Sequence, residues 1–323
     1  MPANLTPEYL AADRKFKAAV TPQEKLAALE EMLATIPKHK GTEKMQADIK
    51  RRIARLRAEA QRQRRAARGK PFYHVDREGA GQLVLAGAPN TGKSALLAAL
   101  TNAAPEVAEY PFTTRVPLPG MMIYENVQIQ LVDLPPITAD LTEGWLYALI
   151  RTADGVLLVA DLASDDLLEQ TDQVLTLLAR ANIHLSPPPA PPHQKPALVI
   201  ANKLDASGAG DRLALLREFL GSRLPVLAVS AGMGTGLEAL REAAFRLLGV
   251  IRVYSKPPGR KADLSAPFIL PAGATVLDAA EAIHKDLRDS LRYARLWRRQ
   301  GAQGQMVGRD HVLADGDVIE IHA

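Results

Sequence analysis

Residues 82–100 read QLVLAGAPNTGKSALLAAL. The stretch begins with a short apolar run, its residues 87–94 match the phosphate-loop pattern G-x-x-x-x-G-K-[ST] in full, and an apolar helical segment follows. A strand, a glycine-bounded loop and a helix in this order surround phosphate groups with backbone N–H groups at a helix N-terminus. The stretch therefore predicts an α/β fold that binds a nucleotide.

Apolar runs that predict strands alternate with helical stretches after this loop. The predicted strands cover residues 121–124, 127–132, 156–160, 198–201 and 226–229, and the predicted helices cover residues 167–181, 211–220 and 237–248. Continuous apolar strands that alternate with helices are typical of a mostly parallel sheet covered on both faces. Ligands of such sheets bind at the carboxyl ends of the strands. We therefore expect the phosphate loop, Asp133, Asn202 and Ser230 to lie on one rim.

Residues 202–205 read Asn-Lys-Leu-Asp, the tetrapeptide that selects guanine in GTP-binding proteins. The Asp205 carboxylate can accept hydrogen bonds from N1–H and the 2-amino group of guanine, whereas adenine would turn a lone pair toward it. Such a mismatch of buried polar groups is a large discrimination. We expect Asn202 to bond the base N7 and tie loops together, and the Lys203 stem to pack on the ring face. The backbone of Ser230 and Ala231 would reach the 6-oxo group.

The phosphate loop carries its own chemistry. Gly87 and Gly92 permit backbone turns that a side chain would block. Lys93 is expected to bridge the β- and γ-phosphates, and the Ser94 hydroxyl to coordinate Mg²⁺. Asp133, at the end of a predicted strand, would hold the metal or its water. The residues expected to bind the nucleotide are Gly87, Ala88, Pro89, Asn90, Thr91, Gly92, Lys93, Ser94, Ala95, Asn202, Lys203, Asp205, Ser230 and Ala231.

Composition restricts the class of protein. The chain has no cysteine, which excludes disulfides and cysteine-ligated metal centres. It has no apolar run long enough to span a membrane and no signal-peptide pattern at its N-terminus, so we expect a soluble, cytoplasmic monomer. The net charge of +4 is unevenly spread, because residues 1–70 hold 17 Lys and Arg against 8 Asp and Glu. A basic arm on an acidic body suggests an anionic partner.

Residues 1–70 read as a basic helical hairpin. Apolar residues recur at helical spacing over residues 26–36 and 45–56, and a Pro-to-Gly break separates the two stretches. The outer face of the second helix is basic and comprises Lys50, Arg51, Arg55, Arg57, Arg62, Arg64, Arg65 and Arg68. Such a row can follow a nucleic-acid backbone, and without aromatic residues it favours backbone contact over base reading. The alternative is an ordinary solvated, charge-rich helix.

The motifs together resemble a known family. The segment Tyr110-Pro111-Phe112-Thr113-Thr114, together with GAPNTGKS, DLPP, NKLD and SA, is similar to the Obg/HflX-like GTPases, and within them to the developmentally regulated GTP-binding proteins. Residues 252–259 and 315–321 resemble the entry and last strand of a TGS domain, a small β-grasp fold. The resemblance implies a basic arm (1–70), a P-loop GTPase domain (71–250) and a TGS domain (251–323). It also implies a translation-associated GTPase that contacts the ribosome or structured RNA.

The resemblance assigns further roles. Thr113 or Thr114 would be the switch threonine that meets Mg²⁺ and the γ-phosphate, and the sequence leaves open which one. Asn90 matches the asparagine that helps hold K⁺ beside the phosphates in potassium-stimulated relatives, where the cation neutralises transition-state charge. The implied catalytic residues are Lys93, Asn90, Thr113 and Thr114, and the implied metal-site residues are Ser94, Thr113, Thr114 and Asp133. Ile137 occupies the position of the water-orienting glutamine of Ras-like proteins.

One motif departs from the family. The usual Asp-x-x-Gly is here Asp133-Leu134-Pro135-Pro136. Proline has no N–H, so the usual backbone bond to the γ-phosphate cannot form at Pro136. The insert domain of the eukaryotic and archaeal relatives is also absent. We expect slow unassisted hydrolysis; the N–H of Ile137 taking over is one alternative, and a non-hydrolysing guanine-nucleotide-binding adaptor for RNA or the ribosome is another.

The C-terminal region predicts strands around one helix. The expected strands cover residues 268–270, 293–297 and 317–322, and the expected helix runs from Thr275 to about residue 287. Tyr293, Arg295, Trp297 and Arg299 would share one strand face, where alternating basic and aromatic residues could grip RNA. The alternative is that the two aromatic residues pack inward. Residues 187–196 predict a stiff, extended surface loop.

Overall fold

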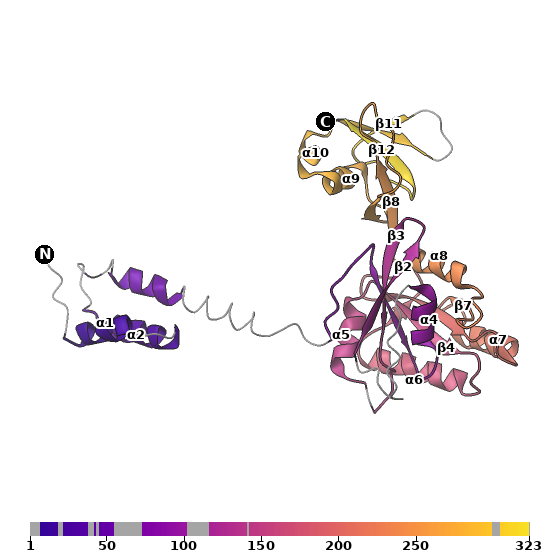
Figure 1. Cartoon of the computed structure of the whole chain (residues 1–323), viewed down its shortest axis with the longest axis horizontal. Helices are drawn as coiled ribbons and strands as arrows, with labels where there is room; N and C mark the ends of the chain where they lie inside the picture. The colour runs from indigo at the N-terminus through magenta and orange to yellow at the C-terminus, as the bar shows by residue number, and fades with distance from the viewer. Residues whose placement is uncertain are drawn as a thin grey trace. The chain divides into compact units, whose positions relative to one another are not determined.

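The computed structural model describes residues 7–18, 22–37, 42, 45–54, 73–101, 116–140, 142–298 and 304–322 (Figure 1). The chain divides into two compact units, Met1–His74 and Val75–Ala323. Among the residues that the structure describes, none of the helices combines the length and the apolar character of a membrane span.

The first unit is helical. Its described elements are α1 (Pro7–Ala18), α2 (Pro22–Thr35) and a helix over residues 45–54. The last two are the helical pair that the sequence predicts, and α1 adds a third member to their core. That core consists of Tyr9, Ala12, Leu29, Met32, Ile36, Ile49 and Ile53. The apolar spacing therefore positions the helices, because each stripe faces the same centre.

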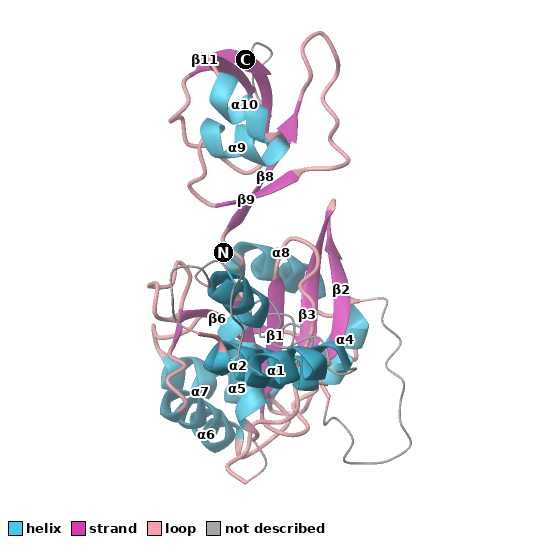
Figure 2. Cartoon of the chain, turned by 90° about the vertical axis from the view of Figure 1, so that its left-hand side faces the viewer, coloured by secondary structure: helices cyan, strands magenta, loops and turns pink. Residues whose placement is uncertain are grey.

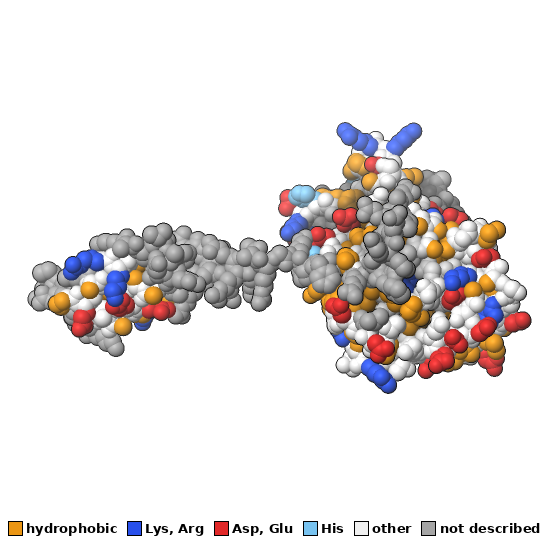
Figure 3. All heavy atoms as spheres, turned by 60° about the horizontal axis from the view of Figure 1, so that its bottom comes forward, with side chains coloured by type: hydrophobic (Ala, Val, Ile, Leu, Met, Phe, Trp, Pro, Cys, Tyr) orange, Lys and Arg blue, Asp and Glu red, His pale blue; other side chains and the backbone are white. Residues whose placement is uncertain are grey.

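The charge of the arm lies mostly outside the described residues. Of the expected basic row, Lys50 and Arg51 are described and exposed, whereas the arginines from Arg55 onward are not among the described residues. The described helices carry both signs of charge on the face seen in Figure 3, and two acidic residues pair with basic ones, Glu31 with Lys15 and Asp48 with Arg52. On that face the described helices thus present a mixed rather than a purely basic surface.

The second unit contains a seven-stranded sheet with the order β2-β3-β1-β4-β6-β5, in which β7 also pairs with β6. The pair β2–β3 is antiparallel and every other pair is parallel. The strands are β1 (Gln82–Gly87), β2 (Leu118–Tyr124), β3 (Val127–Asp133), β4 (Gly155–Asp161), β5 (Leu185–Ser186), β6 (Lys195–Asn202) and β7 (Val226–Ala228). The prediction of a mostly parallel α/β sheet is confirmed.

Helices cover both faces of this sheet. They are α4 (Lys93–Leu100), α5 (Gly144–Thr152), α6 (Leu167–Arg180), α7 (Ala209–Leu220) and α8 (Leu237–Leu247). Side chains of α4 and α8 share one core with alternate residues of the strands, including Leu83, Leu85, Leu157 and Val159. The remaining residues of β4 point to the opposite face of the sheet, where α6 lies. Strands buried on both faces explain why the sequence shows continuous apolar runs.

The local pattern missed some elements. Helix α5 follows β3 after a turn at residues 139–140. It is too short for the helical period of 3.6 residues to be recognised within its apolar stretch. Strand β5 is two residues long and pairs with Lys195 and Pro196 at the start of β6. The extended loop therefore ends earlier than the sequence predicts, at residue 194, because β6 begins at Lys195.

The C-terminal part of the second unit forms a separate five-stranded sheet with the order β11-β10-β12-β8-β9. Its strands are β8 (Val250–Ser255), β9 (Phe268–Pro271), β10 (Tyr293–Trp297), β11 (Gln305–Val307) and β12 (Asp317–His322). Helices α9 (Val276–Ile283) and α10 (Lys285–Ser290) lie against it in Figure 2. Strand β11 was not predicted from the sequence.

The predicted helix over 275–287 is two helices. Thr275 begins α9 with a capping box to Asp278, as the sequence indicates. At His284 the backbone is extended, with φ −163° and ψ 135°, which ends α9. The His284 ring then accepts from the N–H of Asp286 and caps α10. The sequence predicts one continuous helix here, but the chain forms two helices because His284 ends α9 and caps α10.

The outer face of β10 carries the expected residues. Ala294 and Leu296 are buried in the core, so Tyr293, Arg295 and Trp297 point the other way. The prediction that these three residues share a face is confirmed, and inward packing of the aromatic rings is wrong; Arg299 lies outside the described residues. The Tyr293 ring stacks on His322, and Lys256 Nζ lies 4.5 Å from the centre of the Trp297 ring. Both rings are therefore already partly covered.

Candidate functional site

The carboxyl ends of the parallel strands form one rim. Leu85 pairs with Asp133 and Asp161 pairs with Asn202, so the last residues of β1, β3, β4 and β6 come together. The phosphate loop joins β1 to α4 at this rim. Its glycines are required: a Cβ on Gly87 would lie 2.4 Å from the Val159 carbonyl oxygen, and one on Gly92 (φ 88°) 2.4 Å from Asn202 Nδ2.

Lys93 is folded back on its own loop. It is 6% exposed, and its Nζ donates to the carbonyl oxygens of Gly87 at 3.3 Å and Ala88 at 2.8 Å. Burial lowers the pKa of Lys93 to about 8, although the nearby charge of Asp133 opposes the shift. Among the described residues the ammonium has only backbone carbonyls as hydrogen-bond acceptors, and phosphate oxygens would compensate its charge better.

Ser94 and Asp133 form the candidate metal site. The Ser94 hydroxyl donates to Asp133 Oδ2 at 2.5 Å. Asp133 is 1% exposed, and its Oδ1 has no hydrogen-bond partner among the described residues. Burial raises the pKa of the Asp133 carboxyl, whereas Ser94 and Lys93 act to lower it. A hydroxyl beside a buried carboxylate with an unused oxygen fits the oxygen ligands that Mg²⁺ takes, directly or through water.

Asn202 ties three loops together. Its Nδ2 donates to the Thr91 carbonyl at 3.0 Å, its Oδ1 accepts from the Ala231 N–H at 3.1 Å, and its carbonyl accepts from the N–H of Leu162. The side chain is 2% exposed. The expectation that Asn202 joins loops therefore agrees with the geometry, and both of its amide atoms are already occupied by protein partners.

The residues expected to read the base lie together. The Ser230 hydroxyl donates to Asp205 Oδ1 at 2.5 Å, and this bond lowers the pKa of the Asp205 carboxyl. Asp205 is exposed, so its remaining acceptor positions face solvent. A carboxylate that stays ionised and reachable is what recognition of two adjacent N–H donors requires.

Asp161 is a site residue that the sequence reasoning missed. Its Oδ2 lies 2.6 Å from Lys203 Nζ, and its Oδ1 accepts from the Ala163 N–H at 2.8 Å. Lys203 has a left-handed backbone (φ 66°), and the ion pair fixes the far end of its side chain. The signal was available, because Asp161 is an acidic residue at the carboxyl end of an apolar strand, as Asp133 is.

The Asp133-Leu134-Pro135-Pro136 segment stays bonded to β1. The N–H of Leu134 donates to the Leu85 carbonyl at 3.2 Å, and the N–H of Ile137 donates to the Gly87 carbonyl at 3.1 Å. Ile137 is 1% exposed. The N–H that could replace the missing glycine is thus engaged with the phosphate loop, and it must leave that carbonyl before it can meet a phosphate.

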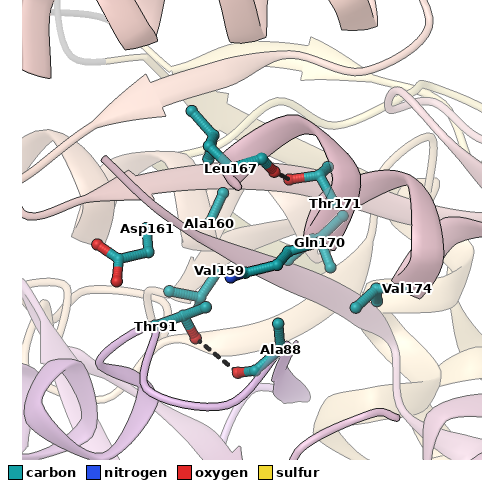
Figure 4. Close-up of a pocket in the computed structure, with 10 residues that line it drawn as sticks. Ala88, Thr91, Val159, Ala160, Asp161, Leu167, Gln170, Thr171 and Val174 are labelled. Atoms are coloured by element: carbon teal, nitrogen blue, oxygen red, sulfur yellow. Dashed lines mark hydrogen bonds between the residues drawn. The ribbon is translucent and has the colours of Figure 1, made fainter. Parts of the chain in front are cut away.

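The space beneath the loop is too small for a ligand. Figure 4 shows it between Ala88, Thr91 and Asp161 on one side and α6 on the other, where the Thr91 hydroxyl donates to the Ala88 carbonyl at 3.2 Å. Its volume is about 10 Å³, roughly one water. A nucleotide does not fit into this space. Thr113 and Thr114 lie outside the described residues, and Asn90 is exposed with φ 61°.

Comparison with known proteins agrees with this geometry. A family described as "50S ribosome-binding GTPase" matches residues 82–203, and the TGS domain matches residues 251–323. A protein of Methanocaldococcus jannaschii named as an uncharacterized GTP-binding protein is 30% identical, over 93% of this chain and 92% of its own length. The mouse developmentally-regulated GTP-binding protein 2 is 27% identical, over 92% of this chain and 98% of its own. The chain belongs to the developmentally regulated GTP-binding protein family.

Family membership indicates that the ligand of the rim is a guanine nucleotide. The chain is a GTP-binding protein with a P-loop GTPase domain and a C-terminal TGS domain, and GTPases of this kind use Mg²⁺. The solved YchF GTPase of Schizosaccharomyces pombe shares the fold, with a TM-score of 0.53 and 12% identity over 79% of this chain and all of that one. The alignment with the M. jannaschii relative spans 361 residues, more than the 323 of this chain. That relative therefore has residues without a counterpart here.

The buried Lys93 predicts a proton linked to nucleotide binding. Without nucleotide its pKa is about 8, and phosphates should raise it, because they favour the ammonium form. At about pH 9, GDP binding should take up a proton, and the affinity should fall as the pH rises above about 8. Near neutral pH Lys93 is charged in both states, so the uptake should vanish.

Calorimetry in buffers of different ionisation enthalpy measures this uptake. Lys195 is the matched control, because burial also lowers its pKa but it bonds the carbonyls of Arg151 and Ala153. A Lys195→Met variant should keep the uptake. Equal proton exchange at both pH values would contradict the assignment to Lys93.

Proposed function

We propose that this protein hydrolyses GTP to GDP and phosphate in association with the ribosome. The observation that carries the proposal is the bond between Ser94 and Asp133 beside Lys93, on the same rim as Asp205. Water would attack the γ-phosphorus, the bond to the β–γ bridging oxygen would break, and GDP would leave with that electron pair. The family description of a 50S ribosome-binding GTPase supports the ribosomal part.

The residues divide this work. Lys93 would exchange its two backbone carbonyls for β- and γ-phosphate oxygens, and loop N–H groups would hold the remaining charge. Ser94, Asp133 and either Thr113 or Thr114 would hold Mg²⁺, which supplies positive charge at the β- and γ-oxygens. Asn90 would hold a K⁺ ion. Asp205 would read guanine between the Lys203 stem and the Ala231 backbone.

One observation indicates that GTP hydrolysis by this protein alone is slow or absent. Pro136 offers no N–H, and that of Ile137 already bonds Gly87. A protein with this constraint senses the γ-phosphate weakly, and it depends on an activator for turnover. The second candidate function is therefore a nucleotide-binding adaptor for RNA or the ribosome that does not hydrolyse GTP.

The proposed organisation has three parts: a basic arm (1–70), a GTPase domain (71–250) and a TGS domain (251–323). The separate helical core of the first unit and the five-stranded C-terminal sheet support these boundaries. The arm would contact ribosomal RNA through its basic residues. The protein would work as a cytoplasmic monomer.

Purine selectivity tests the base site. Asp205→Ala should lower the affinity for GDP by about a hundredfold and leave the weak affinity for ADP unchanged, because the carboxylate pairs with N–H donors that only guanine presents. Competition calorimetry measures both affinities. Asp211→Ala, an exposed acidic residue at the start of α7, is the control and should change neither. Equal uptake of ADP and GDP by the unmodified protein would refute the base site.

Pro136→Gly tests the switch segment. A restored N–H can bond the γ-phosphate, and a hydrogen bond to a charged group is worth about tenfold or more in affinity. The variant should therefore raise the affinity for β,γ-imido-GTP relative to GDP by about tenfold. Pro135→Gly is the matched control, since it gains an N–H one residue away from the motif position. Fast, unassisted phosphate release by the unmodified protein would show that Pro136 imposes no limit.

Salt dependence tests the arm. Sedimentation with ribosomes should weaken steeply as salt is raised, because each neutralised phosphate contributes about −0.7 to −0.9 to the slope of log affinity against log salt. Arg62→Gln combined with Arg64→Gln should make that slope shallower. Arg180→Gln combined with Arg217→Gln, two exposed changes in the GTPase domain, is the control. A slope that the arm variant leaves unchanged would assign ribosome contact to another surface.

A further inference from the structure

The β2–β3 hairpin reaches from the nucleotide site to the TGS domain. It pairs in register from Leu118 opposite Asp133, at the candidate metal site, to Tyr124 opposite Val127, at the other end. Seven residues per strand make a ladder about 20 Å long. One end holds the carboxylate of the metal site, and the opposite end is the turn Glu125-Asn126.

The hairpin and α4 are packed together, because their apolar side chains share a core. Met122, Ile129 and Leu131 are fully buried in the same cluster as Leu96 and Leu97 of α4. A Cβ on Gly120 would lie 2.9 Å from Leu97 Cδ1, so the two elements are in close contact. Helix α4 begins with Lys93, so the hairpin and the phosphate loop share a rigid support.

The Glu125-Asn126 turn of the hairpin contacts β8, the first strand of the TGS domain. Arg252 of β8 is 6% exposed and forms an ion pair with Glu125. The same guanidinium binds Asp315 through two nitrogens, and it lies over the rings of Tyr124 and Phe245 at 5.8 and 5.0 Å from their centres. One buried charge thus joins the turn to the residues that precede β12.

The turn also has two features that bear on whether it can shift. Glu125 is a non-glycine residue with φ 49°. Asn126 Nδ2 donates to the Tyr254 hydroxyl at 2.7 Å and to the Leu264 carbonyl at 3.0 Å, but its Oδ1 is buried without a hydrogen-bond partner among the described residues. The left-handed residue belongs to the ordinary geometry of a two-residue hairpin turn, whereas the unpaired buried acceptor could gain a partner if the turn shifted.

We propose that the Glu125-Asn126 turn is a regulatory joint through which the TGS domain responds to the nucleotide bound at the other end of the hairpin. A change at Asp133 moves the hairpin with α4, and Arg252 and Tyr254 pass that movement to β8 and β12. By linkage, a partner that binds the TGS domain changes the relative affinity for GTP and GDP by the same factor. The inference rests on the proposed function, since it requires two nucleotide states.

Trp297 provides a reporter within the TGS domain. The sequence has two tryptophans, so a Trp145→Phe background leaves only Trp297, on β10 next to Lys256. Its emission is measured with GDP and with β,γ-imido-GTP in the full chain, and calorimetry measures the affinity for each nucleotide in the same samples. The emission should differ between the two nucleotides. Glu125→Gln should remove most of that difference, because it deletes the ion pair but leaves Arg252 bound to Asp315.

Glu281→Gln is the matched control. It removes a carboxylate from an exposed pair between α9 and α10, with Arg288, and should leave the nucleotide-dependent difference intact. Asn126→Ala is a second test, and it should also reduce the difference. The inference is overturned if both nucleotides bind but Trp297 emission is the same, or if the difference survives both changes at the turn. Absence of nucleotide binding would instead overturn the proposed function, and the inference with it.

Discussion

The side chain of Asn202 is the constraint on which the nucleotide site depends. One amide bonds the phosphate loop at Thr91 and the base-reading segment at Ala231, and the same residue's carbonyl receives Leu162. It also explains a glycine, because any side chain at Gly92 would collide with this amide. An Asn is buried at the end of a strand only if all of its polar atoms are bonded, and here they are. This one side chain therefore fixes the phosphate loop and the base-reading segment relative to each other.

Electrostatics then sets how the two halves of the site differ. The phosphate half is buried, so that burial lowers the pKa of Lys93 and raises that of Asp133. The base half is exposed, and the Asp205 carboxyl has a lowered pKa because Ser230 donates to it. In the phosphate half, burial disfavours the charged forms of Lys93 and Asp133. In the base half, the hydrogen bond from Ser230 favours the charged form of Asp205. Phosphate contact should accordingly contribute binding energy, and base contact should contribute selectivity.

The sequence predicts the sheet and the rim because both rest on local patterns. Buried strands require continuous apolar runs, and a phosphate loop requires its glycines, Lys93 and Ser94 at fixed spacing. The pairing of Lys203 with Asp161, the bond from Ile137 to Gly87 and the break at His284 depend on contacts that no short pattern contains. Strands β5 and β11, of two and three residues, are too short to show a period. The sequence thus predicts which residues form the site better than it predicts which residues they contact.

The backbone contacts of Lys93 set a cost on phosphate binding. Its ammonium donates to the carbonyls of Gly87 and Ala88, which are the positions that phosphate oxygens would have to replace as acceptors. Two backbone acceptors make the buried ammonium less unfavourable than an unpaired charge would be. An incoming nucleotide must in turn compete with those carbonyls. The exchange of acceptors therefore subtracts from the binding energy that the phosphate contacts contribute.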